Sequence, residues 1–384
     1  MNWLTGGRAG EAKRFISQLA DLNKRDRAAQ ELIRLGPDAV PALIEALQTN
    51  DESLPPLYGQ ILIRIGSPAI PALTKALGTA HPLVRGRVAE ALGMARNDQA
   101  IPALLDALRS EFYTVRAKAA TALGNIGNPK AIDPLLKLLR DPEGDVRIGA
   151  VQSVGKFCDP GTFDKIANVL LDDPIIEVRQ AAARVLGNTG HPSAGFFLME
   201  ALRDSFWWYE REHAAGDLLQ AIENIGVPVV DSLIEALGDR EGTVRKFAAL
   251  VLGRIGDPRA IEELGMTLYD LHHDVGFAAA ESLARFGAPA IKVLSEALSH
   301  PEPSVREHAV IGLGEIQDVR VAPVLIEMVK DPERRVQKQA VQSLGQLRDE
   351  HALSALRVIA ADRSDRELSM LARQYLEGDS SFSS

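Results

Sequence analysis

One stretch, residues 115–141, shows the hydrophobic pattern from which most of the chain is built. Its first apolar positions recur at spacings of 4, 4 and 3, namely Val115, Ala119, Leu123 and Ile126. This spacing places them on one stripe of an α-helix. Gly127 can adopt the left-handed conformation that ends a helix, and the Asn128-Pro129 pair is typical of a turn.

A second helical stripe follows in the same stretch. Its apolar positions are Ile132, Leu135, Leu136 and Leu139. Pro134 falls in the first turn, where the missing N–H of proline is tolerated. Because neither helix can bury its apolar stripe alone, we expect the two to pack together and against further copies of the unit.

The position of Gly124 recurs along almost the whole chain at intervals of 30 to 36 residues. Its occupants are Ile33, Ile63, Gly93, Gly124, Gly155, Gly187, Glu223, Gly253, Ala284, Gly314 and Gly345. A steady period with two helices per unit predicts an α-helical solenoid. We therefore predict an all-α chain, a right-handed superhelix of about eleven helix pairs without a β-sheet.

Arginine recurs eight residues before the repeat position, at Arg25, Arg85, Arg116, Arg147, Arg179, Arg245 and Arg306. Asp141, Asp173 and Asp239 each lie six residues ahead of such an arginine. A guanidinium group can donate to carboxylates and carbonyls together. We predict a ladder of Asp–Arg bonds between stacked repeats, with solvated surface charges as the alternative.

The units resemble HEAT repeats of the short variety first named for phycobilisome lyase subunits. Three motifs give this resemblance over roughly residues 20–360: Val-Arg, Ala-Leu-Gly-x-Ile-Gly and x-Pro-x-Ala-Ile-x-x-Leu. The resemblance implies antiparallel helix pairs whose first helices line a concave face. It implies little about activity, because a fold does not determine a function.

We predict a single solenoid over residues 1–384. Its ends differ from the repeats, since terminal units need a polar outer side. The predicted parts are a lead-in and cap helix over 1–22, with a loose start to residue 10 and a helix from Glu11 to Leu22, repeats over 23–360, a C-terminal cap over 361–377 and a disordered tail over 378–384.

The period has one clear break, the interval of 36 residues between Gly187 and Glu223. Arg211 precedes Gly226 by 15 residues, whereas Arg116 precedes Gly127 by 11. Four extra residues are about one helical turn. The break therefore predicts a first helix that is longer by a turn at its start.

Four aromatic residues are consecutive in this break: Phe206, Trp207, Trp208 and Tyr209. A helix cannot bury four consecutive side chains on one face. Because Trp and Tyr are favoured anchors at interfaces, we predict a partner-binding site at these residues. The alternative is a structural plug between repeats.

A mostly polar row lies three residues before the repeat position. It comprises Gln30, Gln60, Glu90, Thr121, Gln152, Arg184, Gln220, Leu250, Glu281, Ile311 and Gln342. By helical phase the row lies off the buried stripe, on the side that the resemblance makes concave. We predict that the row from Glu90 to Ile311 binds a partner, with Leu250 and Ile311 as apolar anchors. The alternative is a wetted surface without a partner.

Candidate metal ligands are sparse. Glu212-His213 and Glu307-His308 have the reverse order of the His-Glu pairs with which HEAT-repeat deoxyhypusine hydroxylases bind two irons, and they lie about three repeats apart. The segment His272-His273-Asp274 reads as a solvated turn, and Cys158 as a small structural thiol. We predict no catalytic residue, no metal and no cofactor.

Composition narrows the class of partner. The formal net charge of −9 disfavours general nucleic-acid binding, which relies on clustered Lys and Arg. The single cysteine cannot form an internal disulfide. The sequence contains no run of 18 apolar residues, the length that would span a membrane. We expect a cytoplasmic protein.

These patterns favour a non-enzymatic scaffold that binds a protein partner along its concave face. The alternative from the family resemblance is a bilin lyase subunit or another phycobilisome-related chromophore-handling protein. In that case the tryptophans would stack on a flat tetrapyrrole. A HEAT-like nucleic-acid glycosylase is disfavoured by the acidic balance.

Overall fold

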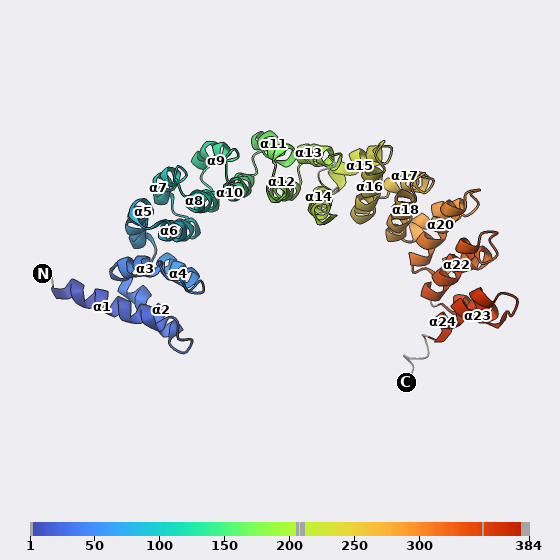
Figure 1. Ribbon diagram of the computed structural model, residues 1–384, viewed down its shortest axis with the longest axis horizontal. Helices are drawn as coiled ribbons and strands as arrows, with labels where there is room; N and C mark the ends of the chain where they lie inside the picture. Colours follow the sequence, from blue (N-terminus) through green and yellow to red (C-terminus); the bar gives the residue numbers. More distant parts are fainter. Residues whose placement is uncertain (1–2, 205–206, 208–211, 348, 378–384) are drawn as a thin grey trace. The chain divides into compact units, whose positions relative to one another are not determined.

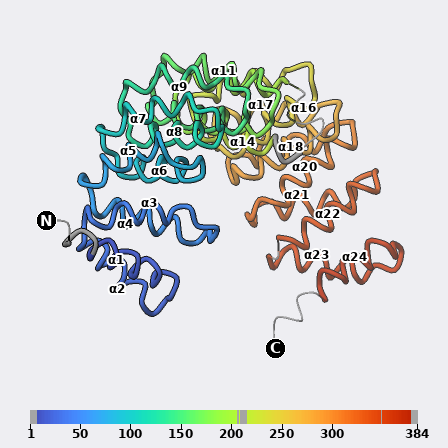
Figure 2. Tube along the Cα trace, turned by 60° about the vertical axis from the view of Figure 1, so that its left-hand side comes forward, coloured from blue at the N-terminus to red at the C-terminus, as the bar shows by residue number. Residues whose placement is uncertain are grey.

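The computed structural model describes residues 3–204, 207, 212–347 and 349–377, and it is all-α over these residues. The chain divides into two compact units, Met1–Thr189 (unit 1) and Gly190–Ser384 (unit 2). Figure 1 shows the helices of each unit stacked side by side, and Figure 2 shows the same stacks from another direction. The predicted α-solenoid of helix pairs is confirmed.

Unit 1 alternates the first and second helices of successive repeats. Its helices are α1 (Trp3–Gln18), α2 (Arg25–Leu35), α3 (Val40–Ala46), α4 (Pro55–Ile65), α5 (Ile70–Thr79), α6 (Pro82–Ala95), α7 (Ile101–Ala107), α8 (Tyr113–Ile126), α9 (Ile132–Leu138), α10 (Gly144–Gly155), α11 (Phe163–Asp172) and α12 (Ile176–Asn188).

Unit 2 continues the same alternation. Its helices are α13 (Pro192–Leu202), α14 (Glu212–Ile225), α15 (Val230–Ala236), α16 (Gly242–Ile255), α17 (Ala260–Thr267), α18 (His273–Phe286), α19 (Ile291–Ala297), α20 (Pro303–Glu315), α21 (Ala322–Met328), α22 (Arg334–Leu347), α23 (Glu350–Ala361) and α24 (Arg366–Glu377).

The connection between α8 and α9 shows how the sequence ends one helix and starts the next. Gly127 adopts a left-handed φ of 76°, and its N–H donates to the carbonyl of Leu123. The side chain of Asn128 then accepts a hydrogen bond from the N–H of Lys130, which begins a short 3-10 turn over Pro129–Ala131. The turn leads directly into α9, so the two helices reverse direction within few residues.

Close approach of first helices explains the glycine at the repeat position. A Cβ atom at Gly124 would lie 2.5 Å from the Cβ of Ser153 on the next first helix, α10. Ser153 is buried, and its hydroxyl donates to the carbonyl of Ala120 at 2.9 Å. At this distance the two helices leave no space for a side chain at position 124. The apolar pattern of the sequence does not by itself reveal this close approach.

The ends of the chain differ from the sequence expectation in one place. Helix α1 begins at Trp3 and ends at Gln18, so a helix occupies most of the predicted loose start. Helix α24, Arg366–Glu377, falls within the predicted C-terminal cap. Residues 378–384 lie outside the described residues, and the division of the chain into one solenoid with two caps stays a prediction.

The predicted Asp–Arg ladder is confirmed at Arg147. Its guanidinium donates to both carboxylate oxygens of Asp173, at 2.6 and 2.9 Å, and to the carbonyl of Asp141 at 2.8 Å. The carboxylate of Asp141 in turn accepts two bonds from Arg116 of the preceding repeat. Although burial raises the pKa of Asp141, the bonds from Arg116 and from the N–H of Glu143 hold it below its usual value.

The same bidentate geometry recurs in unit 2. Arg245 pairs with Asp270, and Arg306 pairs with Asp331. In each case the aspartate lies in the turn after the second helix of a repeat, and the arginine belongs to the first helix of the same repeat. The arginine of the first helix therefore bonds to the aspartate after the second helix and, as at Arg147, to the turn that precedes both.

The length of the helix after the break stays a prediction, because residues 208–211, directly before Glu212, lie outside the described residues. The described part of α14 runs from Glu212 to Ile225. The residue 11 positions before Gly226, and therefore the equivalent of Arg116, is Ala215 rather than Arg211. This repeat has no ladder arginine.

Candidate functional site

The first helices of unit 1 lie on the inner side of the curve that this unit follows, and its second helices lie on the outer side (Figure 1). We call the accessible residues of α2, α4, α6, α8, α10 and α12 the inner face of unit 1. The predicted polar row reaches solvent throughout. Gln30, Gln60, Glu90, Gln152, Arg184 and Gln220 are exposed, and Thr121, Leu250, Glu281, Ile311 and Gln342 are half-buried.

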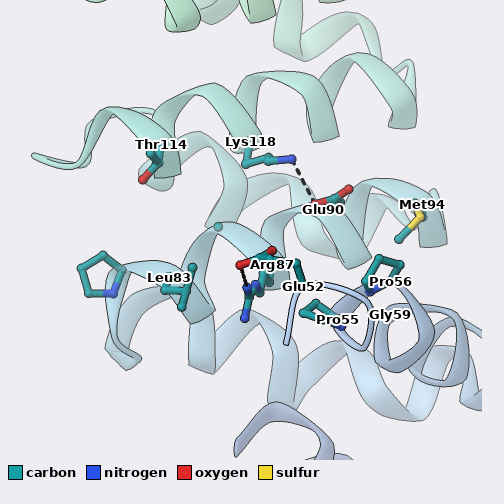
Figure 3. A pocket seen from close by; sticks show the side chains of 12 residues that line it. Glu52, Pro55, Pro56, Gly59, Leu83, Arg87, Glu90, Met94, Thr114 and Lys118 are labelled. Atoms are coloured by element: carbon teal, nitrogen blue, oxygen red, sulfur yellow. Dashed lines mark hydrogen bonds and ion pairs between the residues drawn. The ribbon is translucent and has the colours of Figure 1, made fainter. Parts of the chain in front are cut away.

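A groove of about 320 Å³ interrupts the inner face between α4, α6 and α8 (Figure 3). It is lined by Glu52, Pro55, Pro56, Gly59, Pro82, Leu83, Gly86, Arg87, Glu90, Met94, Thr114 and Lys118. Leu83 and Met94 are each 41% exposed, although both are large apolar side chains. The groove thus offers accessible apolar surface on an otherwise polar face.

The groove arises because one repeat lacks its ladder arginine. Pro55 occupies that position, at the start of α4, and Arg87 of α6 reaches back to replace it. The Nη1 atom of Arg87 donates to the carbonyls of Leu47 at 2.6 Å and Thr49 at 2.8 Å. These carbonyls lie eight and six residues before Pro55, and Arg147 likewise bonds to the carbonyl six residues before itself.

Two glycines keep the floor of the groove open. A Cβ at Gly59 would lie 3.2 Å from the Cε of Met94, and one at Gly86 would meet only the Cγ of Lys118, at 3.8 Å. Neither glycine has a positive φ, so its role here is to omit a side chain rather than to allow a turn. Larger residues at these positions would fill the hollow.

Ion pairs flank the apolar floor. Lys118 pairs with Glu90 at 3.1 Å, and both side chains are half exposed. Arg87 pairs with Glu52 at 2.9 Å, and the carboxylate of Glu52 is 83% exposed. Figure 3 shows both pairs at the groove. Exposed pairs of this kind contribute little to stability, so they can exchange partners with a bound ligand at small cost.

The sequence prediction reached this site only in part. Of the predicted residues, only Glu90 lines the groove, while Gln152 and Arg184 line a second hollow of about 460 Å³ between α10 and α12. Arg87, Leu83 and Met94 were missed. The available signal was the Pro55-Pro56 pair at the start of a repeat, because it removes the ladder arginine.

Among the described residues of unit 2, no hydrogen bond or ion pair joins one residue of the predicted row to another. Gln220 donates to Asn224 at 3.1 Å, one turn along its own helix. Glu281 pairs with Arg285 at 3.5 Å, again within one helix. The binding role of Gln220, Leu250, Glu281 and Ile311 stays a prediction.

The aromatic segment is described at one residue. Trp207 is fully buried, which favours the structural interpretation for this side chain over an exposed anchor. Phe206, Trp208 and Tyr209 lie outside the described residues. Partner binding by the aromatic cluster therefore stays a prediction, and Trp207 is not accessible to a partner in this conformation.

The side chain of His308 lies in the core of the protein rather than on its surface. Its ring is buried and lies edge-on to the ring of His273, at 4.6 Å between centroids. Burial and, to a smaller extent, the charge of His273 lower the pKa of His308 to about 4, although the carbonyl of Leu268 opposes this shift. Its neighbour Glu307 pairs with Arg335 at 3.4 Å.

The other candidate chemical groups are dispersed. His272 is exposed and contacts the guanidinium of Arg245 at 3.0 Å, and Asp274 pairs with Lys246. Cys158 is exposed, and its thiol donates to the carbonyl of Gly155. Over the described parts of the chain, no group of three or more His, Cys, Asp or Glu side chains is placed to hold a metal.

Among the helices whose residues are described, none is long and apolar enough to cross a membrane.

Structural comparison relates the chain to the karyopherin Kap121p. Crystal structures of Kap121p alone and of Kap121p bound to the extreme C-terminus of the protein phosphatase Cdc14p are 14% and 13% identical to the chain, with TM-scores of 0.58 and 0.59. Both matches cover 96% of this chain and 49% of the karyopherin. The chain thus spans about half the length of these neighbours, and at this identity the likeness shows the fold alone.

A structure of human deoxyhypusine hydroxylase in complex with glycerol is 21% identical, with a TM-score of 0.31, and covers 68% of this chain and 99% of that chain. So low a TM-score supports no argument about function. Comparison with curated proteins found no match.

Family models give the clearest relationship. A model of PBS lyase HEAT-like repeats matches residues 24–49. The model of HEAT repeats matches most of the chain, over residues 57–114, 70–147, 101–182, 132–218, 230–299 and 291–377. Together with the repeated helix pairs, these matches show that the chain belongs to the HEAT-repeat family.

Proposed function

We propose that the chain is a non-enzymatic adaptor that binds an extended segment of a protein partner along the inner face of unit 1. The observation that supports this most is the groove between α4, α6 and α8, where Leu83 and Met94 remain exposed beside a floor of proline and glycine. Apolar surface of this kind is costly to leave in water and marks interaction sites.

The chemistry of the groove fits a peptide side chain. Its volume of about 320 Å³ is at the lower end of the range for small-molecule sites, and the groove is bounded by only three helices. An aliphatic side chain of a partner would contact Leu83, Met94 and Pro56. The exposed carboxylates of Glu52 and Glu90 at the rim would then bond to polar groups of the segment.

The polar row would hold the backbone of such a segment. Gln60 and Gln152 are exposed, and each amide side chain can both donate and accept a hydrogen bond. A peptide in extended conformation presents N–H and C=O groups at regular intervals, which suits donors and acceptors repeated along a solenoid. Specificity would come from the groove, and the row would add backbone bonds.

One neighbour illustrates the binding mode. The Kap121p structure bound to the extreme C-terminus of Cdc14p is a HEAT-like solenoid that holds a terminal segment of another protein. The present chain matches half of that protein at low identity, so the neighbour supports only the mode of binding. It does not identify the partner of this chain.

A peptide-display selection on the intact chain tests the proposal. Peptides selected on the unmodified protein would be measured against Gly86→Trp, in which the new side chain occupies the groove. Gly78→Trp is the matched control, because Gly78 lies on the outer helix α5 and a Cβ there meets nothing within 4 Å. We expect Gly86→Trp to weaken binding by at least about ten-fold.

The readout separates binding from folding. Circular dichroism of both tryptophan variants must match that of the parent before their binding is compared, and neither new Cβ meets an atom closer than 3.8 Å. Equal binding by the parent and by Gly86→Trp would contradict the proposal. A loss of binding shared by Gly78→Trp would also contradict it.

The chromophore alternative depended on the tryptophan cluster. Trp207 is buried, so its ring is not open to stacking on a tetrapyrrole in the described conformation. Co-expression with a bilin-producing pathway distinguishes the two functions. We expect the purified chain to be colourless, and stable visible absorbance would favour the chromophore role instead.

A further inference from the structure

Three exposed cations lie on or directly after first helices of unit 1, namely Arg96 after α6, Lys156 after α10 and Arg184 on α12. In the part of the chain that the structure describes none of them forms an ion pair with a carboxylate, and the same holds for Arg27 on α2 and Arg64 on α4. Lys156 and Arg184 differ from these two because they line one hollow.

Lys156 and Arg184 lie in one hollow. This hollow, of about 460 Å³, is lined by both cations together with Gln152, Val185 and Asn188, and no carboxylate contributes to its lining. Lys156 donates to the side-chain carbonyl of Asn125 at 2.5 Å, and Arg184 donates to the carbonyl of Gln180 on its own helix. The remaining N–H groups of both cations are thus available to a ligand.

Arg96 adds to the same positive field. Burial and, after it, the charge of Arg96 lower the pKa of Lys156 below its usual value, which indicates that the two cations repel each other. Arg96 follows α6 in a left-handed conformation with φ of 47°. Like charges held together without a counter-charge create a local potential that attracts an anionic group.

We propose that Lys156 and Arg184 bind an acidic stretch of the partner segment whose apolar side chain enters the groove. This inference rests on the proposed function and defines the chemistry of the partner. The segment would carry two or more Asp or Glu residues on one side of an aliphatic anchor.

The dimensions are compatible with one continuous segment. Stacked helices lie roughly 8–10 Å apart, so the three steps from α6 to α12 cover about 30 Å. An extended peptide rises about 3.3 Å per residue, so about nine residues span this distance. Because α8 borders the groove and α10 borders the hollow, about one helix step separates them, so the acidic residues would follow the aliphatic one within a few residues.

The surroundings favour a peptide over a nucleic acid. Nucleic-acid surfaces use many cations along a phosphate backbone, whereas here two cations stand among amides and the apolar side chain of Val185. The carboxylates Glu52 and Glu90 on the adjoining groove would repel the phosphate that every nucleotide carries. A peptide can place its acidic side chains at the hollow and an uncharged side chain at the groove.

The test uses peptides selected on the intact chain and a double variant, Lys156→Gln with Arg184→Gln. The matched control removes the same charge elsewhere, with Lys137→Gln on the outer helix α9 and Lys165→Gln on the outer helix α11. We expect the selected peptides to be enriched in Asp and Glu beside an aliphatic residue. The double variant should weaken their binding about five-fold, which corresponds to two exposed ion pairs, and the control variant should leave it unchanged.

Salt provides a second readout. Binding by the parent should weaken as ionic strength rises, and this dependence should be smaller in the double variant. Selected peptides without acidic enrichment would overturn the inference, as would equal losses in the control variant. Tighter binding of oligouridylate than of the selected peptides would also overturn it in favour of a nucleic acid.

The outcomes separate the inference from the proposed function. If Gly86→Trp abolishes peptide binding while the double glutamine variant binds normally, only the acidic-segment inference fails. If Gly86→Trp has no effect, the proposed function fails, whatever the double variant does.

Discussion

Four repeats lack an arginine at the ladder position, where Pro55, Ala215, Gly276 and Gln337 stand instead. At Pro55 and Gly276 a side chain of the following repeat occupies the space. In unit 1, Pro55 takes the arginine position and Arg87 reaches back to the carbonyls of Leu47 and Thr49. In unit 2, Gly276 takes that position, and His308 occupies the space beside it. Arg87 and His308 hold equivalent places, each two residues after the ladder position of its own repeat.

The length of the replacing side chain decides what remains. The long arginine extends over its neighbours, so the groove above Pro55 and Gly86 stays accessible. The short histidine instead lies inside, where a Cβ at Gly276 would be 2.5 Å from its Nδ1 atom. The same defect in the repeat thus leads to a candidate binding site in unit 1 and to a closed core in unit 2.

The largest effect is expected where the ladder is intact. Arg147→Met leaves Asp173 without its buried partner, and the side chains of this pair are only 9% and 5% exposed. We expect the free energy of unfolding to fall by about 3–5 kcal/mol. Denaturant unfolding measures this change.

A double variant provides the control for this first prediction. Arg147→Met with Asp173→Leu removes both charges, and apolar residues can replace a buried pair at small cost. We expect it to be more stable than Arg147→Met alone. If the double variant is the less stable of the two, the pair is not coupled as the geometry indicates.

Lowering the pH should destabilise the folded chain through His308, the side chain that lies beside Gly276 in unit 2. Because the pKa of folded His308 is about 4 and that of a free histidine is 6.5, only the unfolded chain gains this proton between these values. The contribution of neutral His308 is therefore fully present above pH 6.5 and is lost as the pH falls toward 4, by about 1.4 kcal/mol per pH unit.

This pH dependence can be assigned to one residue. Thermal unfolding of the parent and of His308→Leu would be compared from neutral pH to pH 4. We expect the difference in stability between them to shift in favour of the leucine variant as the pH falls. Parallel curves would show that His308 is not buried in its neutral form.

The repair in unit 1 should be worth less than an intact ladder pair. Arg87→Met removes the bonds to two backbone carbonyls, and we expect a loss of about 1–3 kcal/mol in the free energy of unfolding. Glu52→Gln is the control, since its carboxylate is 83% exposed and its removal should cost less than about 1 kcal/mol. Equal losses in both variants would assign the effect to the surface pair.

The smallest effect has the opposite sign in the two regions. Gly86→Ala places a Cβ at ordinary contact distance from Lys118, so better helix propensity should raise stability by up to about 1 kcal/mol. Gly276→Ala forces its Cβ against the buried ring of His308 and should destabilise. Melting temperatures of the two variants test the contrast, and a shift in the same direction for both would refute it.

The sequence predicted what depends on a repeated local pattern. Helix pairs follow from apolar spacing around Leu123 and from the stop at Gly127, and the Asp–Arg ladder follows from the recurrence of Arg147 and Asp141 at fixed positions. These interactions lie within one unit or between adjacent equivalent positions. A regular sequence therefore contains enough information to locate them.

The groove could not be predicted in this way, because it results from a missing interaction and its repair. Whether Arg87 points to solvent or back to Thr49 depends on the space that Pro55 leaves in the preceding repeat. The alignment of the repeat with α14 failed for a related reason, since Arg211 was taken as the equivalent of Arg116 whereas Ala215 occupies that position. Irregular positions break the register on which the prediction relied.

The backward reach of Arg87 has a consequence for how this chain can be shortened or extended. A repeat whose arginine bonds to the turn before its own first helix, such as the one that contains Arg147, does not depend on the following repeat for these bonds. The repeats that begin at Pro55 and Pro82 cannot be separated, because the second supplies the bonds that the first lacks. Gene duplication and protein engineering would have to move these two repeats together, and the groove would be inherited with them.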